Sequence, residues 1–261
     1  MSDRAKLIQG PRGFSSRSGV SSPSVMFAES AELYDAIYFT FKDYEAEAAI
    51  IAQRLRALNP QALTILDVAC GTGEHARLLA SQHGFQVDGL DVNPEFLRLA
   101  RIKHPGGHFY AADMTQFSLA HRYDAVICMF SSIGYVRTLA ALEQAFRCFA
   151  QHLAPNGVVM VEPWFPPERM VPGHQSNRSA EAHGVHVDRR GTTFIDGRLC
   201  RIRFDYTLVE AGITRHTSEV HELGLFTGEE TLRAFAAAGL DAKHEADSPS
   251  HRGLYIARLA S

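Results

Sequence analysis

The sequence predicts an α/β fold: a doubly wound, mostly parallel sheet, with an antiparallel β insertion between its fifth strand and the last helix. Two observations indicate this fold. From residue 63 to residue 162, strand-like segments alternate with helix-like ones, which is typical of crossover units on a parallel sheet. Beyond residue 163 the alternation stops, and segments rich in β-branched and aromatic residues are separated by glycine-containing pairs. With 261 residues, 46% of them apolar, the chain can fill the core of one large domain.

The core elements follow from the spacing of apolar residues. Two helices, at residues 29–38 and 42–58, precede the first strand at 63–68. Further helices are expected at residues 74–83, 94–103 and 138–152, and further strands at 86–90, 108–111, 125–130 and 158–162. Helices between parallel strands cover both faces of a sheet, so we expect a layer of helices on each side.

A run of prolines between residues 163 and 172 marks a loop and the start of the insertion. Residues 185–221 read as antiparallel hairpins, with turns expected at Arg190-Gly191, Asp196-Gly197 and Ala211-Gly212. A helix then begins with a capping box from Thr227 to Glu230 and runs to residue 238, and a strand at 253–259 completes the fold.

We divide the chain into four parts. Residues 1–28 are rich in serine and glycine and are expected to be a disordered tail, in preference to a transit peptide. Residues 29–162 form the expected cofactor-binding core, residues 163–222 an antiparallel insertion over the active site, and residues 223–261 complete the core.

Charge and cysteine content exclude several classes of protein. The chain has 26 Lys+Arg against 29 Asp+Glu, a net charge of −3, so it has no field that would gather nucleic acid or anionic lipid. Its four cysteines are scattered, which argues against a zinc site or a disulfide framework, and no metal site is expected. With no apolar run of about 18 residues and no signal-peptide core, the expected protein is cytoplasmic, without a membrane partner.

The most informative motif is LDVACGTGEH at residues 66–75, where the first strand passes into a helix. Gly71 and Gly73 allow a tight turn and a close approach of the backbone to a ligand. Asp91 ends the second strand, where a carboxylate can accept hydrogen bonds from both ribose hydroxyls of a nucleoside. Asp113 and Met114 follow the third strand and offer an acceptor for an exocyclic amine and an apolar surface for a purine. Three strand ends therefore converge on one nucleoside.

Two cofactors compete for this site. The spacing Gly71-x-Gly73-x-x-Ala76 also satisfies the dinucleotide fingerprint of dehydrogenases. Against that reading, Asp67 lies inside the first strand, where dehydrogenases are usually apolar. A buried carboxylate needs partners, and the amides of the glycine turn are the ones we expect. Asp67, Asp91 and Asp113 together resemble the set found in class I methyltransferases, and that resemblance implies S-adenosylmethionine as cofactor.

Four segments of the sequence indicate which molecule accepts the methyl group. Residues 128–135 (CMFSSIGY) stand where enzymes that methylate DNA amines carry an Asn- or Asp-Pro-Pro-aromatic element, which argues against DNA as substrate. Together with residues 66–73, 161–164 (VEPW) and 249–254 (PSHRGL), this segment resembles the N,N-dimethyltransferases of TDP-linked amino sugars of the desosamine and mycaminose type. The resemblance covers residue 29 to the carboxyl end. It implies methyl transfer to the amino group of a nucleotide-linked amino deoxysugar in antibiotic biosynthesis.

The resemblance also implies the site residues. Tyr135 is the expected catalytic residue, facing the amine, in preference to a packing aromatic under the loop. Arg252 is the candidate for the substrate diphosphate, whereas the eight arginines of residues 165–222 are balanced by eight acids and are expected mostly as solvated pairs. The expected cofactor-binding residues are Tyr34, Asp67, Ala69, Gly71, Gly73, Asp91, Val92, Asp113, Met114 and Met129, and the expected substrate-binding residues are Tyr38, Ser131, Glu162, Trp164, His221 and Arg252.

The expected methyl transfer requires mainly that the enzyme position the amine against the methyl group. Methyl transfer from a sulfonium is an in-line displacement, and a neutral amine needs no dedicated base. Three alternatives stay open: a methyltransferase for another small amine or hydroxyl, an NAD-dependent oxidoreductase, and a non-catalytic binding module. A homodimer is possible, but no pattern in the sequence decides the oligomeric state.

Overall fold

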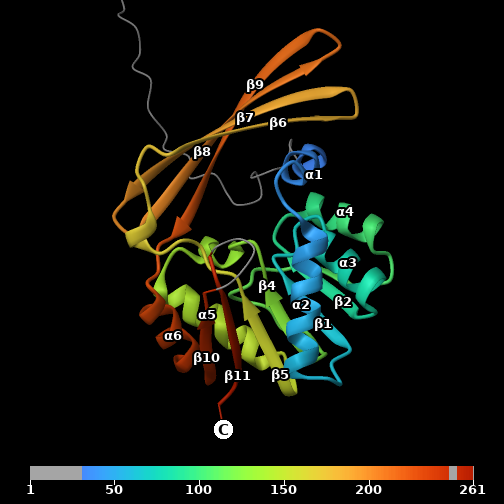
Figure 1. Ribbon diagram of the computed structural model, residues 1–261, viewed down its shortest axis with the longest axis vertical. Helices are drawn as coiled ribbons and strands as arrows, with labels where there is room; N and C mark the ends of the chain where they lie inside the picture. The colour runs from blue at the N-terminus through green and yellow to red at the C-terminus, as the bar shows by residue number, and fades with distance from the viewer. Residues whose placement is uncertain (1–30, 247–251, 261) are drawn as a thin grey trace, which may run out of the picture.

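The computed structural model describes residues 31–246 and 252–260 (Figure 1). The expected disordered tail and residues 249–251 of the PSHRGL segment lie outside the described residues. The first expected helix is present as α1 (Ala31–Phe39). None of the helices in the described part of the chain is long and apolar enough to cross a membrane.

The core is a seven-stranded sheet in the order β10-β11-β5-β4-β1-β2-β3. Five strands are parallel to one another: β1 (Thr64–Val68), β2 (Gln86–Asp91), β3 (Phe109–Ala111), β4 (Tyr123–Cys128) and β5 (Leu153–Val161). Strand β11 (Leu254–Leu259) runs antiparallel to β5, and β10 (Leu240–Glu245) runs antiparallel to β11. The doubly wound, mostly parallel sheet is confirmed.

Strand β10 was not expected from the sequence. Its pattern LDAKHE contains four charged or polar side chains, and only Leu240 is buried. The strand lies at the edge of the sheet, where one side of the ladder is open and polar side chains are tolerated. Hydrophobic alternation, which marks a half-buried strand, is therefore weak here.

Helices cover both faces of this sheet (Figure 1). Residues of α2 (Tyr44–Leu58), α3 (Glu74–His83) and α4 (Pro94–Lys103) share one apolar cluster, and residues of α5 (Leu139–Gln151) and α6 (Gly228–Ala237) share the other. Alternate residues of β1 divide between them, Ile65 facing the first cluster and Leu66 the second. The expected capping box is present, since Thr227 and Glu230 bond each other's backbone amide at the start of α6.

The insertion is a four-stranded antiparallel sheet of β6 (Gln175–Ala182), β7 (Val185–Asp196), β8 (Leu199–Glu210) and β9 (Ile213–Gly224). The turns expected at residues 196–197 and 211–212 join its later strands, but the turn expected at Arg190-Gly191 is wrong. Those two residues lie inside β7, which begins after a turn at 183–184. Gly191 pairs with Phe204, and a Cβ at Gly191 would come within 2.8 Å of the Phe204 ring. The glycine therefore makes room for a ring in mid-strand.

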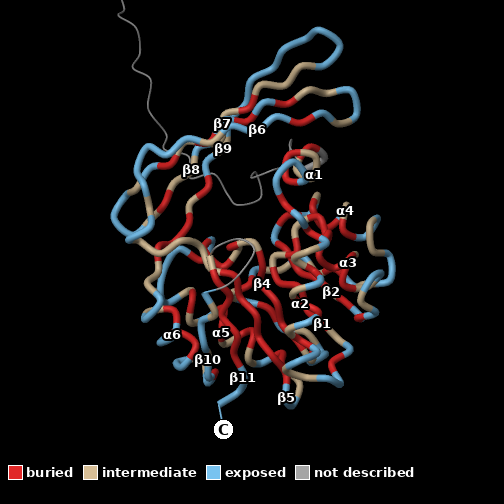
Figure 2. The backbone as a smooth tube through the Cα atoms, in the orientation of Figure 1, coloured by how far each residue is buried: buried red, intermediate tan, exposed pale blue. Residues whose placement is uncertain are grey.

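The antiparallel sheet lies beyond the carboxyl ends of the parallel strands, with α1 packed against it (Figure 1). Leu33 and Ile37 of α1 form an apolar cluster with Ala180, Val187 and Tyr206 of the sheet. Figure 2 shows that buried residues are concentrated in the core sheet, whereas the end of the β8–β9 hairpin is exposed. A space lies between the core and the inner face of the insertion, lined by residues of both.

Candidate active site

A cleft of about 1400 Å³ occupies this space. It is walled by the carboxyl ends of the parallel strands, by α1 and by the inner face of the antiparallel sheet. Most of the expected site residues line it: Tyr34, Tyr38, Ala69, Gly71, Asp91, Val92, Asp113, Met114, Ser131, Tyr135, Trp164, His221 and Arg252. Asp67 and Met129 line a small adjoining cavity of about 30 Å³. Gly73 and Glu162 line neither space, and each acts through a neighbour described below.

Asp91 holds the glycine turn. The Gly71 amide donates to Asp91 Oδ2 at 2.9 Å, and the Asn93 amide donates to Oδ1 at the same distance. Parallel pairing of β1 with β2 places the end of β2 beside the turn that leaves β1, so Asp91 is the carboxylate within reach of that turn. Burial raises the pKa of Asp91, and the amides of Asn93 and Gly71 partly offset this effect.

Asp67 has a different environment from the expected one. We expected the amides of the glycine turn to bond its carboxylate, and this is wrong, because Gly71 serves Asp91 instead. Asp67 is 2% exposed, and its Oδ2 atom has no hydrogen-bond partner within the described residues. Burial raises its pKa from 3.8 to about 7. A buried, unsatisfied acid beside the cleft is suited to a ligand that brings a donor or a positive charge.

The two glycines of the turn serve different purposes. Gly71 has φ +55°, and a Cβ there would meet nothing within 4 Å, so its backbone faces open space in the cleft. Gly73 has φ +77° and caps α3, and its Cβ would lie 2.8 Å from the Cβ of Ala100 on α4. Gly71 is thus free for the approach of a ligand, while Gly73 allows close packing of α4 on the turn.

The remaining residues expected to contact a nucleoside lie along the same edge. Asp113 Oδ1 accepts hydrogen bonds from the amide and hydroxyl of Thr115, both at 2.7 Å, which fixes the turn after β3. Met114 is buried beside it, and Val92 exposes 48% of its surface at the cleft. An acceptor and two apolar side chains therefore sit where the sequence predicted them.

Helix α1 forms an aromatic wall of the cleft. The Tyr34 ring lies 4.2 Å from that of Tyr38 and 4.9 Å from that of Phe96, measured between centroids. Asp35 ties the helix to the core, since its carboxylate lies 2.5 Å from Lys103 Nζ and 2.6 Å from the Thr72 hydroxyl. The helix therefore contacts both the glycine turn and the antiparallel sheet.

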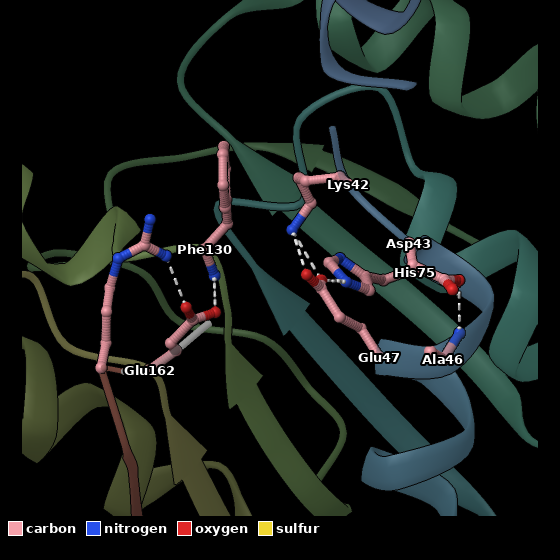
Figure 3. A network of polar contacts seen from close by, with 8 residues as sticks. Lys42, Asp43, Ala46, Glu47, His75, Phe130 and Glu162 are labelled. Atoms are coloured by element: carbon pink, nitrogen blue, oxygen red, sulfur yellow. Dashed lines mark hydrogen bonds and ion pairs between the residues drawn. The ribbon is translucent and has the colours of Figure 1, made fainter. Parts of the chain in front are cut away.

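The loop after β4 carries backbone strain. Phe130 and Ser131 have φ values of +54° and +62°, in the left-handed region that non-glycine residues rarely adopt. Glu162 stabilises this conformation, because its Oε2 accepts the Phe130 amide at 2.8 Å while its Oε1 pairs with Arg252 at 2.6 Å (Figure 3). The Ser131 hydroxyl also donates to the Pro163 carbonyl at 2.7 Å. Glu162 thus supports the cleft wall without lining it.

A buried cationic residue on the other side of Phe130 escaped the sequence reasoning. Lys42 Nζ lies 3.9 Å from the centre of the Phe130 ring and 2.6 Å from Glu47 Oε2, and His75 Nε2 lies 2.8 Å from the same oxygen (Figure 3). Burial lowers the pKa of Lys42, although Glu47 counters this. No sequence pattern marks these residues, because the network joins the start of α2 to α3 through a contact that only the fold creates.

Tyr135 and His221 are brought together across the cleft. Tyr135 belongs to the 3-10 helix η2 (Ser132–Val136), and its hydroxyl lies 2.7 Å from His221 Nδ1 on β9. His221 Nε2 lies 3.2 Å from Glu219 Oε1. Desolvation raises the pKa of Tyr135 well above its ordinary value, so its hydroxyl stays protonated at neutral pH. The phenol is therefore not a base in its resting state.

Fold and cleft together define the class of protein. A glycine turn after β1, a carboxylate ending β2, an acceptor after β3 and the unsatisfied Asp67 fit the ribose, purine and charged end of S-adenosylmethionine. The family model described as a methyltransferase domain matches residues 65–157. The chain is a class I methyltransferase that uses S-adenosylmethionine, and the dinucleotide reading of the glycine pattern is not retained.

Relatives narrow this class. The chain is 44% identical over 230 residues to the dTDP-3-amino-3,6-dideoxy-alpha-D-glucopyranose N,N-dimethyltransferase of Streptomyces fradiae, covering 87% of this chain and 89% of the relative. The crystal structure of Streptomyces venezuelae DesVI superposes with a TM-score of 0.83 at 38% identity, covering 88% of this chain and 98% of DesVI. The S-adenosylmethionine-bound structure of CalS10, an amino pentose methyltransferase from Micromonospora echinaspora, gives a TM-score of 0.79 at 37% identity, covering 86% and 95%. The chain belongs to the family of TDP-amino-sugar N,N-dimethyltransferases.

Proposed function

We propose that this protein transfers methyl groups from S-adenosylmethionine to the amino nitrogen of a TDP-linked amino deoxysugar. The observation that carries the proposal is the two-sided cleft, in which the strand ends of the core form one wall and polar residues of the antiparallel sheet form the other. The first wall suits a nucleoside cofactor. The second offers histidine and arginine side chains to a polar acceptor, and Tyr135 of η2 faces the histidine.

The core residues have distinct tasks in this proposal. S-adenosylmethionine supplies an electrophilic methyl group on a positively charged sulfur. Asp91 accepts hydrogen bonds from the ribose hydroxyls, Asp113 accepts one from the purine amine, and Met114 packs against the purine face. Asp67 accepts a hydrogen bond from the charged end of the cofactor, which gives its Oδ2 atom the partner that it lacks within the described residues.

Tyr135 orients the acceptor amine. Glu219 Oε1, 3.2 Å from His221 Nε2, favours the tautomer with its proton on Nε2. In that tautomer the Tyr135 hydroxyl donates to Nδ1, and a lone pair of the phenol oxygen is left for another donor. An N–H of the amine can fill that place, so the nitrogen lone pair is held toward the methyl group. The amine reaches the site neutral by losing its proton to solvent, and the enzyme contributes position and exclusion of water.

The test is a panel of acceptors with isotope-labelled S-adenosylmethionine and mass spectrometry of the products. The panel contains dTDP-linked 3-amino and 4-amino deoxysugars, a small amine without the nucleotide, and a hydroxyl analogue of the sugar. We expect one or two labelled methyl groups on an amino sugar and none on the hydroxyl analogue. Methylation of the free amine alone, or of no acceptor, would contradict the proposal.

A homodimer in the cytoplasm stays a prediction. Light scattering after size-exclusion chromatography of the full chain would establish the oligomeric state. A monomer across the working concentration range would contradict the dimer and leave the proposed reaction unchanged.

A further inference from the structure

Arg189 occupies an unusual place on the inner face of the antiparallel sheet. Inward-facing residues of β7 alternate with outward-facing ones, and Val187, Arg189 and Gly191 all lie on the buried side. Arg189 is only 5% exposed, although it lines the cleft. Most arginines of this insertion were expected to be solvated, and most are exposed, so Arg189 is the exception among them.

The surroundings of Arg189 are aromatic. Its guanidinium carbon lies 4.4 Å from the centre of the Phe204 ring and 5.0 Å from that of the Tyr38 ring. The Phe204 ring can lie there because Gly191, its partner across the strands, has no side chain. Aromatic faces hold the guanidinium plane in a fixed orientation, so its N–H groups are preorganised.

The charge of Arg189 is not compensated by an acid. Within residues 31–246 and 252–260, its Nη1 atom is buried and has no hydrogen-bond partner, and Arg189 takes part in no ion pair. The Tyr38 side chain interacts with the guanidinium but brings no negative charge. Glu219, across β8, is held by other groups, since its carboxylate accepts the Tyr206 hydroxyl and lies 3.2 Å from His221 Nε2. A buried cation without a nearby anion lowers the stability of the folded protein by several kcal/mol, and a bound anion would offset this loss.

Arg252 gives an instructive contrast. It was the expected ligand of the substrate diphosphate, yet its guanidinium is already paired with the buried Glu162 at 2.6 Å. Its Nε atom, like Nη1 of Arg189, is buried without a hydrogen-bond partner among the described residues, so the two arginines differ in their carboxylate partner. The pair supports the strained loop at Phe130. An arginine with a resident carboxylate offers less of its charge to a ligand than one without.

We propose that Arg189 binds the diphosphate of the nucleotide-sugar acceptor. The identity of the anion rests on the function proposed above, whereas the anion site itself rests on the burial and the missing partner of Arg189. The two parallel N–H groups of a guanidinium match the spacing of phosphate oxygens. Arg189 lies on the wall of the cleft that the antiparallel sheet forms, which is the wall proposed to bind the acceptor. Bound diphosphate would give Nη1 the acceptor that the apo chain lacks.

The experiment measures binding without turnover. Calorimetry with TDP, in the presence of saturating S-adenosylhomocysteine, compares the wild type with Arg189→Gln, Arg189→Lys and Arg190→Gln. Arg190 is the matched control, because it neighbours Arg189 on the same strand and is exposed on the other face. Titration of S-adenosylhomocysteine into each variant tests whether Arg189 instead serves the cofactor's carboxylate.

We expect Arg189→Gln to weaken TDP binding at least about tenfold, with Arg189→Lys in between, because a lysine keeps the charge and loses the fork. Arg190→Gln should bind TDP within about twofold of the wild type, as is usual for an exposed charge. Affinity for S-adenosylhomocysteine should change in none of them. The melting temperature of apo Arg189→Gln should not fall, since the change removes an unpaired buried cation.

Three results would overturn the proposal: unchanged TDP affinity in Arg189→Gln, a loss confined to S-adenosylhomocysteine, or an unfolded Arg189→Gln accompanied by an Arg189→Lys that binds TDP like the wild type. Binding of TDP requires no methyl transfer, so the acceptor panel tests the proposed function separately. A wild type that methylates no amino sugar contradicts the function, while loss of TDP binding in Arg189→Gln still supports the anion site.

Discussion

The buried carboxyl of Asp67 should make the stability of the apo protein fall as pH rises. Its pKa is raised by burial from 3.8 to about 7. Between these values the unfolded chain releases the proton while the folded chain keeps it, so the unfolded state gains stability as pH increases. Below about pH 4 both states are protonated, and above about pH 7 the loss is complete. At 1.36 kcal/mol for each tenfold change in proton affinity, the full loss is about 4 kcal/mol.

Asp67→Asn isolates this contribution, because an amide has no charge to bury. We expect the free energy of unfolding of Asp67→Asn, relative to the wild type, to rise by up to about 4 kcal/mol between pH 4 and pH 8. Urea unfolding of the wild type and Asp67→Asn at four pH values measures this difference. A difference between Asp67→Asn and wild type that does not change with pH, or that falls as pH rises, would refute the reasoning.

Three further predictions concern the site. Asp91→Ala should weaken S-adenosylhomocysteine binding by about 2 kcal/mol or more, the scale of charge-assisted hydrogen bonds, and an unchanged calorimetric Kd would contradict the assignment. Tyr135→Phe should lower kcat no more than about tenfold if the hydroxyl only orients the amine, whereas loss of a general base typically costs a hundredfold or more and removes a limb of the pH profile. Glu162→Gln should lower the free energy of unfolding by about 3 kcal/mol, because it leaves Arg252 as an uncompensated, largely buried cation. In urea unfolding, Glu229→Gln, which breaks an exposed pair, should cost under about 1 kcal/mol, and an equal loss in both variants would count against the account of Glu162.

The cofactor side of the cleft was accessible from the sequence because it is built from strand ends. In a parallel sheet the carboxyl ends of neighbouring strands meet at one edge, so a glycine turn after β1, Asp91 at the end of β2 and Asp113 after β3 must lie close together. Even there, the predicted acceptor of the glycine amide was the wrong carboxylate: Asp67 was expected, and Asp91 accepts the bond. Position along a strand does not say which of two nearby acids faces the turn, and here the pairing of β1 with β2 decides it.

The acceptor side was far less accessible. Arg190-Gly191 resembles a turn by composition, and the true reason for Gly191 is a ring that arrives from β8. Arg189, Lys42 and Glu47 are ordinary charged residues in the sequence. Their importance comes from burial, which depends on contacts between segments far apart in the chain.

The register of the antiparallel sheet decides what the acceptor meets. Tyr206 of β8 pairs with Arg189 of β7, and Phe204 of β8 pairs with Glu219 of β9. The cation and the acid therefore lie on either side of β8. A slip of one residue would turn every inward side chain outward, because successive residues of a strand point to opposite faces. In the proposed function the core holds the cofactor through backbone turns and strand ends, which lie outside the insertion. We therefore expect changes of acceptor within this fold to arise from inward positions of β7, β8 and β9, with the cofactor site preserved.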